Sequence, residues 1–187
     1  MDAIDVGVDS RKHHPYLYHF RDVDWAIFGS VTWSRPARRC PYSARAGQCR
    51  RKDIEGVLYR TCVDLDLRKE HLAYYWATEF GAAGECHMHF LVASDGLGDV
   101  APAEFARVFT EMWTRDFRSL GCQKPGVGTA VVKPYDQAYE DRGAAYCLKR
   151  EYDDSGRERE RFDFLSPRLF NLIQKYQRVN VEMLNGL

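Results

Sequence analysis

The sequence lacks several features that would place it in a familiar class. Its 27 Lys and Arg residues balance 27 Asp and Glu residues, so the chain carries no net charge. Composition alone therefore gives no sign for or against a nucleic-acid partner. No apolar run approaches the roughly 20 residues of a membrane-spanning helix, and no apolar segment near the start is typical of a secretory signal. These absences exclude a membrane span and restrict any basic surface to a local patch.

The six cysteines form no Cys-x-x-Cys pair. This scatter is typical of a reducing compartment, and we expect a cytoplasmic location. Cys40 and Cys49 could contribute to a zinc site but would supply only half of one. The chain also lacks the Gly-x-x-x-x-Gly-Lys-Ser/Thr loop of nucleotide-driven motors. Because 187 residues suit one compact domain, we expect residues 1–187 to form a single domain.

Hydrophobic periodicity predicts an α+β fold. Strands are indicated by alternation and by β-branched and aromatic residues, and helices by apolar residues at helical spacing. The predicted order matches a ferredoxin- or RRM-like split βαβ core, with an antiparallel central sheet and helices packed against one face. The expected elements are a strand at 25–33, a helix or mixed segment from 53, strands at 72–79 and 87–92 joined by a turn at 81–84, a helix from 102, a strand at 128–133, a helix at 137–150 interrupted at Gly143, and a helix from 167 capped by Ser166.

His87-Met88-His89 is the most informative short pattern. Residues i and i+2 of a strand project from the same face, so the two imidazoles converge. Glu79 lies on the other strand of the expected hairpin and could face them, while Glu85 on the histidine strand is the competing carboxylate. Two histidines and one carboxylate leave positions open on a divalent ion, as needed when the ion also holds a phosphate oxygen. A purely structural histidine pair is the alternative.

Tyr146 and Lys149 form a second pair, since residues i and i+3 of a helix are neighbours on one face. Packing of the tyrosine and solvation of the lysine would also explain them. Residues 34–52 contain seven cationic residues and no acidic one, and Pro and Gly interrupt their periodicity, which predicts a loop. This loop is either a solvated insertion or an arm that contacts phosphates. Its cationic residues are Arg35, Arg38, Arg39, Arg45, Arg50, Arg51 and Lys52.

Three motifs, in their order and spacing, resemble the replication-initiator branch of the HUH endonucleases. The first is an apolar strand with small hydroxyl residues, Phe28–Trp33. The second is the His-hydrophobic-His triplet at 87–89, and the third is Tyr-x-x-Lys at 146–149. The resemblance spans roughly residues 24–152. The stretch 79–92 is also similar to the metal-binding hairpin of parvoviral initiators, which supports Glu79 over Glu85.

The resemblance implies a sequence-specific single-stranded DNA endonuclease and strand transferase that nicks a replication origin to start rolling-circle replication. Tyr146 would be the single nucleophile and would form a 5′-phosphotyrosyl link. Glu79, His87 and His89 would hold Mn²⁺ or Mg²⁺, which polarises the phosphate. Lys149 would lie beside the phenol or the phosphate.

The resemblance also implies the partners. The substrate would be single-stranded DNA with an origin hairpin, and no membrane is involved. Because no helicase domain is expected, the protein would either act with a host helicase and polymerase or act where DNA is already single-stranded. The location would be the host nucleus if the source is a eukaryotic virus. Tyr139, two helical turns before Tyr146, is the alternative or second nucleophile. The expected DNA contacts are base contacts from Ser30 and Thr32 and phosphate contacts from Arg35, Arg38, Arg39, Arg50 and Arg51.

Two other functions remain open from the sequence. The same fold hosts RNA-recognition modules that stack bases on sheet aromatics, a role for which Tyr74, Tyr75 and Trp76 are candidates. That function would leave the two-histidine strand unexplained. A metal-dependent hydrolase that activates water would need only the metal face, and Tyr146 would then be incidental.

Overall fold

The structure is a computed structural model, and it describes residues 20, 22–33, 44–80, 86–115, 117–119, 122–124, 127–136, 142–148 and 163–184. For residues 44–50, 80, 86, 117–119, 122–124, 142, 145–146 and 177–184 the description covers the backbone alone.

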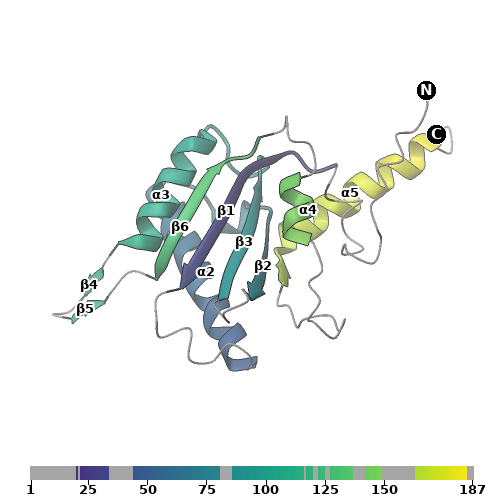
Figure 1. Ribbon diagram of the computed structural model, residues 1–187. Helices are drawn as coiled ribbons and strands as arrows, with labels where there is room; N and C mark the ends of the chain where they lie inside the picture. The colour runs from purple at the N-terminus through teal and green to yellow at the C-terminus, as the bar shows by residue number, and fades with distance from the viewer. Residues whose placement is uncertain are drawn as a thin grey trace, which may run out of the picture.

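A five-stranded antiparallel sheet lies at the centre of the fold (Figure 1). Its strand order is β6-β1-β3-β2-β7. The first four of these strands, with the two helices that connect them, have the order βαββαβ, which is the split βαβ arrangement of the ferredoxin-like fold. The predicted fold class is confirmed. These elements are β1 (Trp25–Trp33), α2 (Ala44–Asp64), β2 (Tyr74–Phe80), β3 (Cys86–Ala93), α3 (Pro102–Thr114) and β6 (Gly128–Pro134).

Shorter elements extend this core. β7 (Asp163–Leu165) pairs with β2 and forms one edge of the sheet, while β4 (Phe117–Ser119) and β5 (Cys122–Lys124) form a separate two-stranded ribbon. A 3₁₀ helix, η2 (Lys69–His71), precedes β2. None of these was predicted, because a three-residue strand or helical turn is too short to produce a recognisable period. Two helices, α4 (Arg142–Leu148) and α5 (Pro167–Leu184), complete the described fold.

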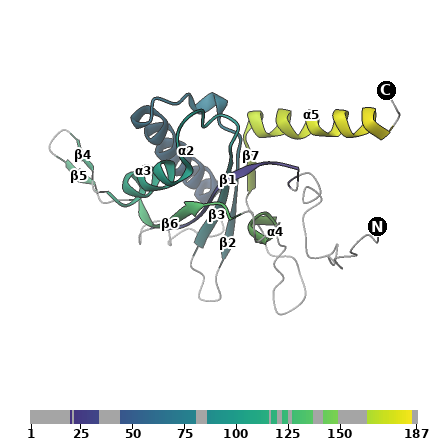
Figure 2. The same ribbon diagram turned by 90° about the horizontal axis from the view of Figure 1, so that it is seen from above.

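Helices cover both faces of the sheet, which corrects the expectation that they pack on one. Figure 2 shows α2 and α3 on one side of the sheet and α4 and α5 on the other. Along β3, Met88 and Phe90 belong to the core under α2 and α3, whereas Leu91 and Ala93 belong to the core under α4 and α5. Successive strand residues point to opposite faces, so apolar residues on both faces require two covering layers. The prediction considered only the connecting helices of the split βαβ core.

The start of α2 also differs from the prediction. Residues 44–52 are helical and not part of a loop, because α2 already begins at Ala44; the alanines, arginines, glutamine and lysine of this stretch are good helix formers. α4 begins at Arg142, so Gly143 lies in its first turn. A Cβ there would come 2.5 Å from the Tyr135 ring, so glycine allows the Tyr135 hydroxyl to accept a 3.2 Å hydrogen bond from the Ala144 N–H. Residues 137–141 and 149–150 of the predicted helix lie outside the described residues.

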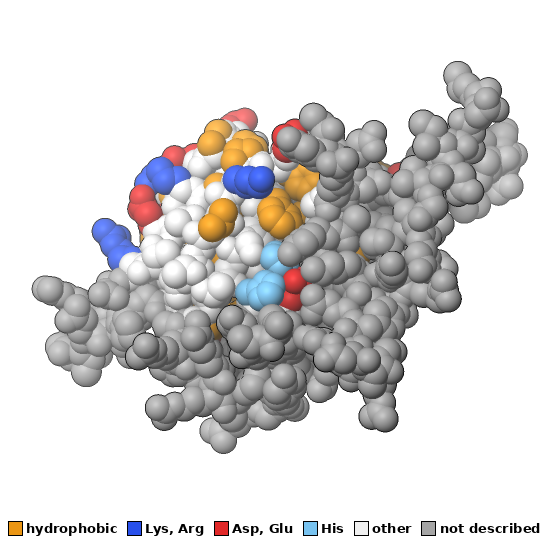
Figure 3. Space-filling model, viewed as in Figure 1, with side chains coloured by type: hydrophobic (Ala, Val, Ile, Leu, Met, Phe, Trp, Pro, Cys, Tyr) orange, Lys and Arg blue, Asp and Glu red, His pale blue; other side chains and the backbone are white. Residues whose placement is uncertain are grey.

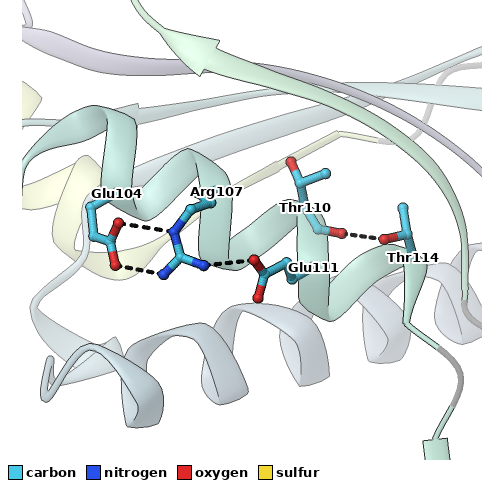
Figure 4. Close-up of polar contacts among 5 residues, drawn as sticks. All are labelled: Glu104, Arg107, Thr110, Glu111 and Thr114. Carbon is cyan, nitrogen blue, oxygen red and sulfur yellow. Dashed lines mark hydrogen bonds and ion pairs between the residues drawn. The ribbon is translucent and has the colours of Figure 1, made fainter.

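The predicted helices from 102 and 167 are confirmed. Ser166 caps α5, since its Oγ accepts a 3.2 Å hydrogen bond from the Leu169 N–H. The exposed face of α3 carries Arg107 between Glu104 and Glu111 (Figure 4), a surface arrangement that contributes little stability. In the described parts of the chain, none of the helices combines the length and the apolar character that a bilayer span needs.

Candidate metal site

Glu79, His87 and His89 form a compact cluster on the sheet face covered by α4 and α5. Glu79 of β2 lies directly opposite His87 of β3, and Ala77 lies opposite His89. The side chain between the two histidines, Met88, points to the other face and is fully buried there. The hairpin register therefore brings together the carboxylate and the two imidazoles that the sequence suggested. The competing Glu85 lies outside the described residues.

The distances within the cluster fit one divalent ion. Glu79 Oε2 lies 3.0 Å from His87 Nε2 and 3.3 Å from His89 Nε2. One donor atom from each residue lies within 4.8 Å of the other two. Ligands at right angles around an octahedral ion, with bonds of about 2.1 Å, lie about 3.0 Å apart. The donor set and its spacing thus suit an ion such as Mn²⁺ or Mg²⁺, with further coordination positions left for a substrate oxygen.

The three side chains of the cluster differ in their exposure to solvent. The side chains of Glu79 and His89 are 2% and 5% exposed, whereas that of His87 is 26% exposed. Figure 3 shows histidine side chains (pale blue) reaching the surface of the sheet face that is seen in Figure 1. A ligand can therefore approach from the His87 side, while the other two donors are held in the protein interior.

Aromatic packing orients the buried imidazole. The Phe28 ring of β1 stacks on His89 with centroids 6.0 Å apart and an interplanar angle of 14°, and the two imidazoles meet edge to face at 5.0 Å. Phe28 was not singled out from the sequence as a site residue. Its position two residues before Ser30, on the same strand face, was the signal that could have identified it.

The hydroxyl residues of β1 lie beside the cluster. Ser30 is opposite His89 and Thr32 is opposite His87 in the β1–β3 pairing, so the structure brings both predicted DNA-contacting residues to the metal face. Thr32 Oγ1 lies 2.5 Å from Thr129 Oγ1 of β6, in an exposed hydrogen bond. Thr129 was missed, because no sequence pattern specifies the register of an edge strand.

The helix that carries Tyr146 packs on the metal-bearing face. Ala144 and Cys147 of α4 are buried in the same cluster as Ala77 and Leu91 of the sheet. The Tyr146 backbone belongs to α4, but its side chain lies outside the described part of the chain. Lys149, the other residue of the Tyr-x-x-Lys pair, and Tyr139, the alternative nucleophile, also lie outside the described residues.

In the described part of the basic segment 34–52, Arg51 lies away from the metal cluster. The Arg51 guanidinium lies 4.3 Å from the centroid of the Phe164 ring, and Phe164 packs against the core under α2 and α3, on the opposite face from the histidines. Arg50 is described by its backbone alone, as part of α2. Three further predicted contacts, Arg35, Arg38 and Arg39, lie outside the described residues, as does Cys40.

The sheet aromatics do not form a surface for base stacking. Tyr74, Tyr75 and Trp76 are at most 4% exposed. Tyr75 packs under α4 and α5, and the other two pack under α2 and α3. Their burial removes the feature on which an RNA-recognition function was based.

Comparison with known proteins assigns no family: no protein-family model, curated protein or solved structure matches the chain. Any functional assignment therefore depends on the site geometry and the sequence motifs.

Proposed function

We propose that this protein is a metal-dependent, single-tyrosine endonuclease of the HUH class that nicks single-stranded DNA at a replication origin. The observation that carries the proposal is the Glu79–His87–His89 cluster on the sheet face against which α4, the helix of Tyr146, packs. The order of the three motifs along the chain supports it.

The three clustered residues would hold Mn²⁺ or Mg²⁺. When bound, the ion would polarise the scissile phosphate and stabilise the negative charge that develops on it. Burial of Glu79 and His89 keeps two donors in fixed positions, which reduces the reorganisation needed when substrate binds. The exposed edge of His87 leaves the phosphate a path to the site.

Tyr146 would be the nucleophile. Its phenol oxygen would form a bond to phosphorus and lose its proton, while the bond between phosphorus and the 3′ oxygen breaks and that oxygen gains a proton. The products are a 5′-phosphotyrosyl link and a free 3′-hydroxyl, which can be rejoined or extended. Lys149, one helical turn later in the Tyr-x-x-Lys motif, would favour the phenolate through its positive charge.

The test is a denaturing gel of protein incubated with Mn²⁺ and a pool of end-labelled single-stranded oligonucleotides. The proposal predicts a covalent protein–DNA band that disappears with EDTA and in Tyr146→Phe. Tyr59→Phe is the matched control, because Tyr59 is an exposed tyrosine of α2. Cleaved ends without an adduct would indicate instead a metal-dependent hydrolase that uses water, and a shifted oligonucleotide band on a native gel, with neither adduct nor cleavage, would indicate a binding module.

A further inference from the structure

The pairing of four strands places polar side chains in one row across the sheet. Glu79 is opposite His87, His87 is opposite Thr32, and Thr32 is opposite Thr129. Directly paired residues of antiparallel strands project from the same face, so all four side chains share the face of the metal cluster. The row begins at a buried carboxylate and ends at an exposed hydroxyl pair.

The hydroxyl pair at the open end of the row can bind an anion. Thr32 Oγ1 and Thr129 Oγ1 share one hydrogen bond. Each hydroxyl has one hydrogen, so the second hydrogen of the pair can be donated to an acceptor on a ligand. Neighbouring strands are about 4.8 Å apart, which places Thr32 roughly 5 Å and Thr129 roughly 10 Å from His87 along the row.

The backbone beneath the pair is held firmly. Trp113 of α3 donates its indole N–H to the Thr32 carbonyl at 3.1 Å, and Trp33 Nε1 donates to Asp53 at 3.1 Å. Gly128 permits the close approach of β6, since a Cβ there would lie 1.8 Å from the Thr32 carbonyl oxygen. Supports from α2, α3 and β6 thus fix the strand end that carries the hydroxyls, which suits a positioning role.

The neighbouring strip of β1 and β6 residues on the same sheet face is compatible with a bound polyanion. On the same face, the next two rows of β1 and β6 pair Ser30 with Val131 and Phe28 with Lys133. None of these residues is acidic, Lys133 is exposed, and Val131 is 70% exposed. Figure 3 shows hydrophobic side chains and a basic one above the histidines on this face. A DNA strand lying on the strip would meet apolar surface, hydroxyls and one cation.

We infer that the Thr32–Thr129 hydroxyl pair binds the phosphate that adjoins the scissile one and thereby selects which phosphate reaches the metal cluster. This inference rests on the proposed function. The hydroxyl pair positions the DNA strand and does not touch the reacting phosphorus. Removal of the hydroxyls should therefore weaken DNA binding and allow cleavage at additional positions. The rate of the chemical step on correctly placed DNA strands should stay the same.

The test compares Thr32→Val, Thr129→Val and the double variant Thr32→Val/Thr129→Val with the parent, because valine keeps the shape of threonine, favours strands and removes only the hydroxyl. Thr129→Ser is the rescue variant. Thr114→Val is the matched control, since the exposed Thr114 hydroxyl lies on α3 and donates to the Thr110 carbonyl (Figure 4). Oligonucleotide affinity is measured by fluorescence anisotropy in Mn²⁺ and in EDTA, Mn²⁺ affinity by calorimetry, and kcat, KM and cleavage positions on gels.

Loss of the hydrogen bond to the charged phosphate should lower oligonucleotide affinity about tenfold in the valine variant whose hydroxyl donates it, and in the double variant Thr32→Val/Thr129→Val. KM should rise with kcat unchanged, additional cleavage positions should appear, and Mn²⁺ affinity should not change. Serine should restore parental behaviour, and the Thr114 control should show no effect.

The two hypotheses can fail separately. If the parent nicks DNA and all three valine variants match it in affinity and cleavage position, the positioning role is wrong and the proposed function stands. If the parent forms no adduct, the proposed function is wrong, and the binding measurement still decides the role of the pair: a loss restored by serine supports it, and unchanged affinity refutes it. A parent that binds no oligonucleotide refutes both.

Discussion

Glu79→Gln tests the metal site most directly, because it keeps the size of the side chain and removes its charge. Glu79 is 3% exposed and contacts both histidines, so its carboxylate is the donor that links the two imidazoles. Substitution of residues that merely support a metal ligand costs about 10- to 100-fold in affinity. We therefore expect loss of this direct ligand to cost at least about 100-fold.

The expected signal is a change in thermal stabilisation by the metal. Mn²⁺ at about 100 times its dissociation constant stabilises a folded protein by about 2.7 kcal/mol. For a domain of this size each kcal/mol shifts the midpoint by about 2–4 °C, so the parent should gain about 5–11 °C. In Glu79→Gln the same Mn²⁺ concentration would only equal the dissociation constant, which gives about 0.4 kcal/mol and a shift of about 1 °C.

The assay is differential scanning calorimetry with Mn²⁺ and with EDTA. Glu111→Gln is the matched control, since Glu111 is an exposed carboxylate of α3 that pairs with Arg107, and this variant should keep the full parental shift. The metal-free Glu79→Gln protein should stay folded, because glutamine preserves the volume. A parental protein that Mn²⁺ does not stabilise, or a Glu79→Gln variant that keeps the full shift, would refute the assignment of this cluster as a metal site.

Four further predictions concern the nucleophile, the basic segment, the core and a buried thiol. Tyr146→Phe should abolish the covalent adduct on a denaturing gel and leave calorimetric Mn²⁺ affinity unchanged, because only the phenol hydroxyl is lost; an adduct that persists would assign the nucleophile to another residue. Gly29→Ala should lower the free energy of unfolding in urea by about 1–3 kcal/mol, since its Cβ would lie 2.1 Å from the Phe90 ring. Gly56→Ala, whose Cβ would meet only a side chain 4.0 Å away, should raise that free energy by about 0.5–1 kcal/mol, and equal effects of the two substitutions would contradict the packing described. Burial raises the pKa of the Cys62 thiol from 9.0 to about 11, so its contribution to stability is present below pH 9 and is lost as the pH rises through about 11; rapid alkylation of Cys62 in the native protein at pH 9 would contradict this. Each phosphate contact contributes about 0.7 to the logarithmic salt dependence of single-strand binding, so a threefold alanine variant should flatten the slope by up to about two units, and an unchanged slope would show that the segment is only solvated. The positions in that variant are Arg38, Arg39 and Arg50.

The elements with strong local signals were predictable from the sequence. The 25–33 strand and the 102 helix carry long apolar patterns whose period belongs to one kind of element. Ser166 and Pro167 mark the start of α5 through capping and ring geometry that act within one turn. For these segments, short-range interactions and burial favour the same structure.

Other features depend on contacts that no local pattern encodes. The first residues of α2, which begins at Ala44, are good helix formers but include few apolar residues, so the apolar period that predicts a helix is missing there. β7 has three residues and is a strand because it pairs with β2. The second helical layer is present because alternate residues of the same strands, such as Leu91, also need burial.

In the candidate site, too, one feature was predictable from the sequence and others depend on the tertiary structure. The spacing of His87 and His89 by itself placed both imidazoles on one strand face, because the side-chain period of a strand is two residues. Only the tertiary structure decided that Glu79 lies opposite His87, that Thr32 continues the row, and that Thr129 ends it. Strand register is set by how the apolar faces of β1, β2, β3 and β6 pack against two layers of helices, and a shift of one residue would turn each of these side chains to the other face.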